Sequence, residues 1–172
     1  NLNYAYKNGK LFFNTRFAVN DRKSDYADFA TQYGYNGENL FTELYNQYQF
    51  SENLKTVAGI QFETQKLEQN SMDLNTLETT LISAKSDARN HNFDAFVNFN
   101  FQVQSFHLDA GMRLITHSEF GNHLVYSINP YYLADLGNYY FKVGVSHSTA
   151  FIAPTVYQNF GSLPYLEPNF EL

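Results

Sequence analysis

The 172-residue chain is long enough for one domain with a core of its own. Aromatic residues make up 18% of the chain and charged residues only 16%, whereas an ordinary soluble domain carries roughly 25% charged residues. A net charge of -6 without a basic cluster argues against nucleic-acid binding, and the absence of cysteine excludes disulfides and thiolate metal sites. The chain shows no signal-peptide pattern and no apolar stretch near the roughly 18 residues of a membrane-spanning helix.

The N-terminal part of the chain alternates apolar and polar residues, which is the pattern of β-strands with one apolar face. Asn8-Gly9 is the strongest hairpin signal, because a primed two-residue turn needs positive φ. A short link, residues 51–53, joins a second pair of strands, whereas the polar residues 21–38 predict a long loop. The four strands expected here are residues 1–7, 10–20, 39–50 and 54–66.

The second half of the chain continues this pattern. The alternation is clearest in "NFDAFVNFNFQVQSFHLDAGMRLIT", residues 92–116, which predicts two strands that turn at 103–105. Two more strands are expected at residues 123–133 and 138–151, with a short link between them. The sequence therefore predicts an all-β fold, an antiparallel up-and-down meander of about eight long strands.

The predicted connections alternate between short and long. An up-and-down transmembrane barrel has short turns at one end and long loops at the other. Its strands run to roughly 9 to 11 residues, whereas soluble strands are more often about 5 to 6. Both features favour a barrel wall, although a soluble sheet with an aromatic core remains an alternative. The short connections are 8–9, 51–53, 103–105 and 134–138, and the long ones are 21–38, 67–90, 117–122 and 152 onward.

In a barrel wall the apolar face contacts lipid and the polar face lines a wet lumen, because only a closed sheet satisfies its backbone groups in hydrocarbon. Aromatic pairs near the short turns predict an interfacial girdle; they are Tyr48 and Phe50, Phe101 and Phe106, Tyr131 and Tyr132, and Tyr139 and Tyr140. The charged residues expected to face the lumen are Arg16, Lys55, Glu63, Asp94, Asp109, Arg113 and Lys142.

The end of the chain, "STAFIAPTVYQNFGSLPYLEPNFEL", residues 148–172, adds a more specific pattern. It resembles a stretch late in the barrels of TonB-dependent outer-membrane receptors, where an aromatic and a small residue precede Ala-Pro-Ser/Thr-x-Tyr. The matching residues are Phe151, Ala153, Pro154, Thr155 and Tyr157.

In the family a Gly-Asn-Pro-x-Leu-Lys-Pro-Glu segment follows this motif. Either Gly161, Pro164 and Leu166 match that segment loosely, or residues 168–172 match its beginning, which is the alignment that we prefer. The segment "MRLITHSEFGNHLVYSINPYYLADLGNYYFKVGVS", residues 112–146, also looks like the family, in particular its cobalamin-receptor-like branch. The resemblance is dense over about residues 105–172 and rests on pattern alone before that.

The resemblance implies a 22-stranded barrel in the bacterial outer membrane. Such a receptor contains an N-terminal plug domain and imports a scarce nutrient, for example a cobalamin- or siderophore-like molecule, with energy delivered through TonB. We expect residues 1–172 to be a partial barrel wall, with no plug domain and no TonB box, cut from a longer chain. Its expected partners are outer-membrane lipid, the nutrient ligand, and the plug and TonB through the missing N-terminal part.

Two other classes of protein stay open. One is a passive porin or a structural outer-membrane barrel without energy coupling. The other is a soluble all-β binding module, which would not need detergent, because soluble monomers rarely expose an apolar patch above a few hundred Å².

Two polar loops could hold a metal ion. Asp21, Asp25 and Asp28 lie close in sequence and could bind calcium, which accepts six to eight oxygens, although Arg22 and Lys23 would repel the ion. The alternative is a solvated extracellular loop that binds no ion. A second loop, "THSEFGNH", carries His117, Glu119 and His123, and imidazole with carboxylate could bind a transition metal. A polar surface loop is again the alternative.

We do not expect an enzyme. Ser146, His147 and Ser148 are consecutive, and neighbouring side chains on a strand point to opposite faces. His147 therefore faces away from both serines, so it cannot act as the base of a simple serine–histidine catalytic pair.

Overall fold

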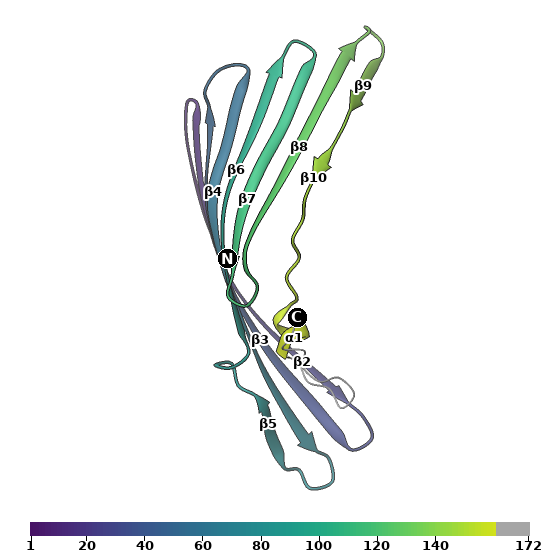
Figure 1. Ribbon diagram of the computed structural model, residues 1–172. Helices are drawn as coiled ribbons and strands as arrows, with labels where there is room; N and C mark the ends of the chain where they lie inside the picture. The colour runs from purple at the N-terminus through teal and green to yellow at the C-terminus, as the bar shows by residue number, and fades with distance from the viewer. Residues whose placement is uncertain (161–172) are drawn as a thin grey trace.

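The computed structural model describes residues 1–160 as one antiparallel sheet followed by a short helix (Figure 1). The predicted all-β up-and-down meander is confirmed, with ten strands instead of eight. The long strands pair in chain order, β1-β2-β3-β4-β6-β7-β8, and β5 pairs with β4 while β9 and β10 pair with β8. The elements are β1 Leu2–Asn8, β2 Leu11–Ala27, β3 Thr31–Gln49, β4 Leu54–Asp73, β5 Thr79–Ser83, β6 Arg89–Val103, β7 Phe106–His117, β8 Gly121–Asp135, β9 Tyr140–Gly144, β10 His147–Ser148 and α1 Val156–Phe160.

The prediction of a long loop at residues 21–38 is wrong. β2 continues to Ala27 and β3 begins at Thr31, so the connection is a turn of residues 28–30. Each residue of 21–27 pairs in register with one of 32–38. On β2 this stretch carries charges on both faces, and on β3 only Tyr33 and Tyr35 give one face an aromatic character, so the period-two signal is weak. The backbone ladder hydrogen bonds need no apolar side chain.

The link predicted at 67–90 is also largely strand. β4 runs on to Asp73, and β5 lies within the link. The predicted loop 117–122 shrinks to the turn 118–120 between β7 and β8. The difference in connection length between the two ends of the sheet is therefore smaller than expected. What projects at the lower end of Figure 1 is a set of hairpins formed by β2, β3, β4 and β5.

Two further turns differ from the sequence prediction. Asn8 pairs with Leu11, so the first hairpin loop is Gly9-Lys10, one residue later than expected. Gly9 has φ 55° and Lys10 does not have positive φ, which fits a type II′ turn. The strand predicted at 138–151 is split into β9 and β10. Pro130 of β8 accepts a hydrogen bond from the backbone N–H of Val145 but has no N–H to return, which weakens the ladder at the break.

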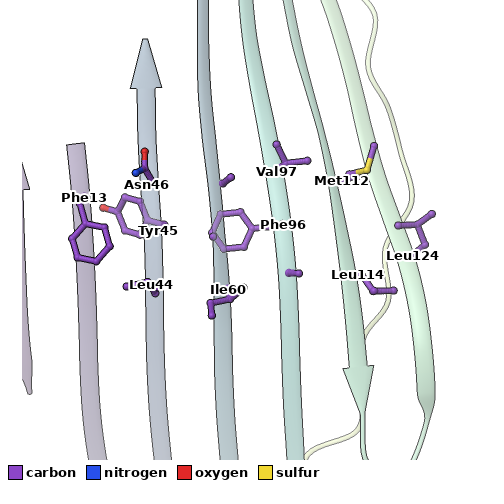
Figure 2. Close-up of a pocket in the computed structure, with 13 residues that line it drawn as sticks. Phe13, Leu44, Tyr45, Asn46, Ile60, Phe96, Val97, Met112, Leu114 and Leu124 are labelled. Carbon is purple, nitrogen blue, oxygen red and sulfur yellow. The ribbon is translucent and has the colours of Figure 1, made fainter. Parts of the chain in front are cut away.

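The register brings the apolar sides of the strands to one face of the sheet. One row across five strands consists of Leu44, Ile60, Ala95, Leu114 and Leu124. Figure 2 shows side chains of this row on neighbouring strands. We call this surface, between the short turns and the row that contains Phe62 and Phe93, the apolar belt.

No second sheet packs on the apolar belt among residues 1–160. Apolar residues buried below a tenth of their surface are few in this part of the chain: Ala18, Tyr33, Leu67, Ala88 and Val156. The accessible surface is 11960 Å², whereas a compact monomer of this mass would have roughly 8,700 Å². The large apolar side chains of the belt are therefore exposed.

The apolar belt ends at a row of charges. Asp21, Glu38, Lys66 and Arg89 are cross-strand neighbours on β2, β3, β4 and β6, on the same face as the belt. Lys85 forms an ion pair with Glu38 at this level. The same strands thus change from apolar to charged along their length, while the backbone ladder continues without a break.

Candidate functional site

The face opposite the apolar belt is polar, and it is the candidate site. Alternation along each strand and the observed register place on it all seven charged residues that were expected to face a lumen. They are Arg16, Lys55, Glu63, Asp94, Asp109, Arg113 and Lys142.

The charges at mid-height pair with rings and with each other. The guanidinium of Arg113 lies 3.4 Å from the carboxylate of Asp94 and 5.2 Å from the ring centre of Phe96. Arg16 stands over Phe41 at 5.6 Å. A guanidinium satisfied by a carboxylate and a ring is held in place, so this part of the face is a preorganised polar surface.

Near the short turns the polar face carries aromatic rings and charges of both signs. Tyr131 stacks on His107 with ring centres 4.6 Å apart, and the ammonium of Lys142 lies 4.0 Å from the centre of the same ring. Asn100 donates a hydrogen bond to Asp109 beside them. Lys55 lines the adjoining groove of about 270 Å³.

The aromatic residues near the short turns divide between the two faces. Tyr131 faces the polar side, and Tyr140 pairs with Asp135 on that side as well. On the apolar side, the residues that form an exposed aromatic edge are Tyr48, Phe101, Phe106 and Tyr132, with Phe50 against Tyr48 in the turn.

The segment after β10 folds back over the polar face and carries the five family-motif residues. Phe151 stacks on His123, with ring centres 3.6 Å apart. Ala153, Pro154 and Thr155 cover a cavity of about 90 Å³ in the sheet. The sheet residues that line this cavity are Glu63, Gln65, Asn90, Asn92 and His117.

A capping box starts α1. The backbone N–H of Gln158 donates to the Thr155 hydroxyl at 3.2 Å, and the Gln158 side chain accepts from the backbone N–H of Thr155 at 2.8 Å. The helix then inserts Val156 against Leu67 and Ala88, the most buried apolar cluster of the described residues. The capping box therefore fixes the point at which the segment docks on β4.

Docking of α1 builds a second pocket from tyrosines. Tyr157 packs edge-on against Tyr35 at 5.5 Å, and Gln69 donates to the Tyr35 hydroxyl at 3.4 Å. Burial, together with the neighbouring Tyr157, raises the pKa of Tyr35 to about 12. The pocket measures about 540 Å³, and Arg22 is also among the residues that line it.

We expect the pKa of Tyr35 to report whether α1 is docked. Thr155→Ala removes the cap, which costs about 1 kcal/mol, and should lower this pKa from about 12 toward 10. Between those values a docked Tyr35 keeps a proton that a released one loses, so rising pH favours release. The measurement is an NMR titration of ¹³C-labelled tyrosine rings, with Tyr35→Phe for assignment. Thr79→Ala in β5 is the control, and a Tyr35 pKa unchanged by Thr155→Ala would show that the cap does not hold the helix.

The structure does not gather the calcium candidates. Asp21 and Asp25 lie on β2, four residues apart, which is roughly 13 Å in an extended strand. Asp28 lies in the following turn, where its carboxylate accepts from the backbone N–H of Ala30 at 3.3 Å. Within residues 1–160 no group of three His, Cys, Asp or Glu side chains could hold a metal ion.

The histidines of the second loop make hydrogen bonds to the backbone. The Nδ1 atom of His117 accepts from the N–H of Glu119 at 3.1 Å, and Nε2 of His123 lies 2.8 Å from the carbonyl oxygen of Phe120. These contacts stabilise the turn between β7 and β8.

The serine–histidine segment is divided between the faces. Ser146 donates to Asn129 on the polar face, whereas His147 pairs with Ile128 and lies 3.1 Å from the Tyr126 hydroxyl on the apolar side.

Comparisons with protein-family models, curated proteins and solved structures give no match. The second half of the family motif falls on residues 161–172, outside the described residues. No helix within residues 1–160 is long and apolar enough to cross a membrane. Function therefore has to be argued from the faces of the sheet.

Sequence reasoning missed the residues that α1 brings together, which include Tyr35, Leu67 and Gln69. One signal was readable, since Thr155 and Gln158 have the spacing of a capping box. Where that helix docks depends on the chain folding back over the sheet, and local sequence does not encode this.

Proposed function

We propose that this chain forms part of the wall of a transmembrane β-barrel in the bacterial outer membrane, of the TonB-dependent receptor kind, and that its apolar belt contacts lipid. The observation that carries the proposal is the belt itself, which is exposed, continuous across the strands and bounded by the charged row of Asp21, Glu38, Lys66 and Arg89. A soluble sandwich would instead bury this face against a second sheet.

The height of the belt fits a bilayer. On β4 the belt runs from Leu54 to Phe62. These nine residues extend about 27 Å along the strand, or roughly 20 Å across the membrane at a tilt near 40°, compared with an apolar band of about 25 Å in known barrels. The charged row then lies where headgroups and water can solvate it.

A lipid-facing sheet also requires closure. β1 at one edge and β9 with β10 at the other are each paired on one side only within residues 1–160. Unpaired backbone groups cost several kcal/mol each in hydrocarbon. Further strands that pair with both edges would complete the barrel. The resemblance to TonB-dependent receptors implies 22 strands in the whole barrel, those of this chain included.

The receptor assignment rests on the motif Phe151, Ala153, Pro154, Thr155 and Tyr157 and on the charged polar face. In such a receptor the polar face contacts the plug domain and water, and the barrel binds a cobalamin- or siderophore-like nutrient for import. A passive porin is the second candidate. The sequence of the whole gene separates the two, because only a receptor encodes a plug domain and a TonB box.

Cysteine labelling tests the lipid contact directly, since the chain has no cysteine of its own. Ile60→Cys and Gln61→Cys place a fluorophore on opposite faces of β4 at nearly the same height. In vesicles whose acyl chains carry nitroxides, we expect strong quenching at position 60 and weak quenching at position 61. Equal quenching at both positions, or a chain that stays monomeric in buffer without detergent, would contradict the proposal.

A further inference from the structure

Two cations stand side by side just beyond the apolar belt. Lys66 of β4 and Arg89 of β6 are direct cross-strand neighbours on the same face as the belt. Like charges that face each other across two strands destabilise a sheet. The ion pairs formed within residues 1–160 involve other cations, so neither Lys66 nor Arg89 is neutralised by direct contact with a carboxylate. This part of the surface therefore favours an external anion.

The carboxylates beside the two cations do not pair with them. Glu38 is the cross-strand neighbour of Lys66 on β3, but its carboxylate binds Lys85. Glu68 and Asp87 lie further from the belt, each two residues along the chain from one of the two cations, and neither forms an ion pair within residues 1–160. The unpaired positive charge is therefore local and belongs to the adjacent strands β4 and β6.

A polar row separates the two cations from the apolar belt. It consists of the cross-strand partners Thr64 and His91, whose Oγ1 and Nδ1 atoms lie 3.1 Å apart. The ring of His91 stacks on Phe62, the last belt residue of β4, with ring centres 6.5 Å apart. Along these two strands the surface changes from apolar through polar to cationic between Phe62 and Lys66, which is about 13 Å along an extended strand.

We propose that Lys66 and Arg89 bind the phosphomonoester headgroup of a membrane lipid whose acyl chains lie on the apolar belt. Such a lipid presents hydrocarbon, ester and phosphate in the same order as the apolar, polar and cationic rows. A guanidinium offers two parallel N–H donors to phosphate oxygens, and an ammonium adds a compact charge. Two adjacent cations match the charge of a phosphomonoester, about -1.5 to -2, better than the single charge of a phosphodiester.

The position of the two cations favours a lipid over free phosphate. A lipid whose chains already contact the belt holds its phosphate near Lys66 and Arg89 at a high effective concentration. Long basic side chains can also reach back along the surface toward the belt. The inference rests on the proposed contact between the apolar belt and lipid. The comparison of quenching at positions 60 and 61 tests that contact separately, because it does not depend on the headgroup.

Lipid selectivity measured beside the two cations tests the inference. Phe93→Cys places a fluorophore at an exposed belt position of β6, in the same strand as Arg89. The full chain is inserted in phosphatidylcholine vesicles, and quenching by brominated phosphatidic acid, a phosphomonoester, is compared with quenching by brominated phosphatidylcholine. Each cation near a membrane surface contributes up to about fivefold to the binding of an anionic lipid. We therefore expect phosphatidic acid to bind at least about fivefold more tightly than phosphatidylcholine.

Lys66→Gln together with Arg89→Gln should make the two lipids bind about equally, and either substitution alone should lower the preference by about half or more. The single variants keep the inference testable if the double variant does not fold. Lys7→Gln together with Lys10→Gln is the matched control. It changes the net charge equally, but both positions lie at the short turn between β1 and β2, at the other end of the sheet. The control should keep the full preference for phosphatidic acid.

Three results would overturn the inference while the lipid contact stands: an unchanged preference in the double variant, an equal preference for phosphatidylglycerol, or a preference abolished by inorganic phosphate at matched ionic strength. The second would show diffuse attraction to negative charge, and the third would identify free phosphate as the ligand. Strong quenching by both lipids without any preference would likewise remove the headgroup site alone. Weak quenching by both lipids would contradict the lipid contact of the belt, and the headgroup site with it.

Discussion

Ile60→Arg is expected to destabilise the membrane-inserted sheet by about 2–4 kcal/mol, the cost of arginine on the lipid face near the bilayer midplane. Ile60 lies inside the apolar belt, between Leu44 of β3 and Ala95 of β6, and 44% of its surface is exposed. A guanidinium there would have hydrocarbon around it and no carboxylate among its cross-strand neighbours. The measurement is the urea midpoint of unfolding from lipid vesicles, followed by loss of β-sheet circular dichroism.

The matched control is Gln61→Arg, one residue further along β4. Its side chain belongs to the polar face, where its cross-strand neighbours are the carboxylates Glu43 and Asp94. We expect a change below about 1 kcal/mol, because an arginine on that face meets water and opposite charge. If both substitutions shift the midpoint equally, the two faces do not differ in environment, and the proposal that the apolar belt contacts lipid is wrong.

Much of the sheet could be predicted because its signal is local. Phe93, Val97 and Phe101 alternate with polar residues, and alternation fixes which side of a strand is apolar. Matching these sides across hairpins then fixes the register, since a slip of one residue would move every side chain to the opposite face. For this reason the polar-face residues Arg113 and Asp94 lie on one surface, as the alternation indicated.

The hairpin extensions could not be predicted in this way. Tyr33 and Tyr35 on one side of β3 alternate with Asn36 and Glu38 on the other, but the signal is short and is interrupted by glycine, and the facing stretch of β2 carries charges on both sides. A strand that is polar or mixed on both sides resembles a loop by composition. Its stability comes from backbone hydrogen bonds to its neighbours, which the local sequence does not reveal.

The candidate site was predictable residue by residue but not as an assembly. Glu63 was assigned to the polar face by alternation, and Thr155 was recognised as part of a family motif. That the two meet at one cavity depends on the chain folding back after β10. Such a contact joins residues 92 positions apart, and nothing in their local sequence encodes it.

Gly59→Val is expected to destabilise the sheet by about 3 kcal/mol, the upper range for overpacking. A Cβ atom at Gly59 would lie 2.6 Å from the carbonyl oxygen of Leu44 and 2.7 Å from the Cβ atom of Tyr45. The ring of Phe96 reaches across from β6 and occupies the remaining space above the glycine, at 2.7 Å (Figure 2). The carbonyl oxygen cannot move away without distorting the ladder between β3 and β4, so relieving the clash costs hydrogen-bond energy.

Gly37→Ala on the neighbouring strand separates this packing effect from the general effect of replacing a strand glycine. A Cβ atom at Gly37 meets nothing closer than 3.8 Å, from the carbonyl oxygen of Arg22. Because glycine in a strand loses more backbone entropy on folding than alanine does, this change should stabilise the protein by about 0.5 kcal/mol. The urea midpoints of both variants should therefore move in opposite directions. A Gly59→Val midpoint equal to that of the unaltered protein would show that the Phe96 ring does not lie over Gly59 of β4. The ring would then not be in the position from which it contacts the guanidinium of Arg113.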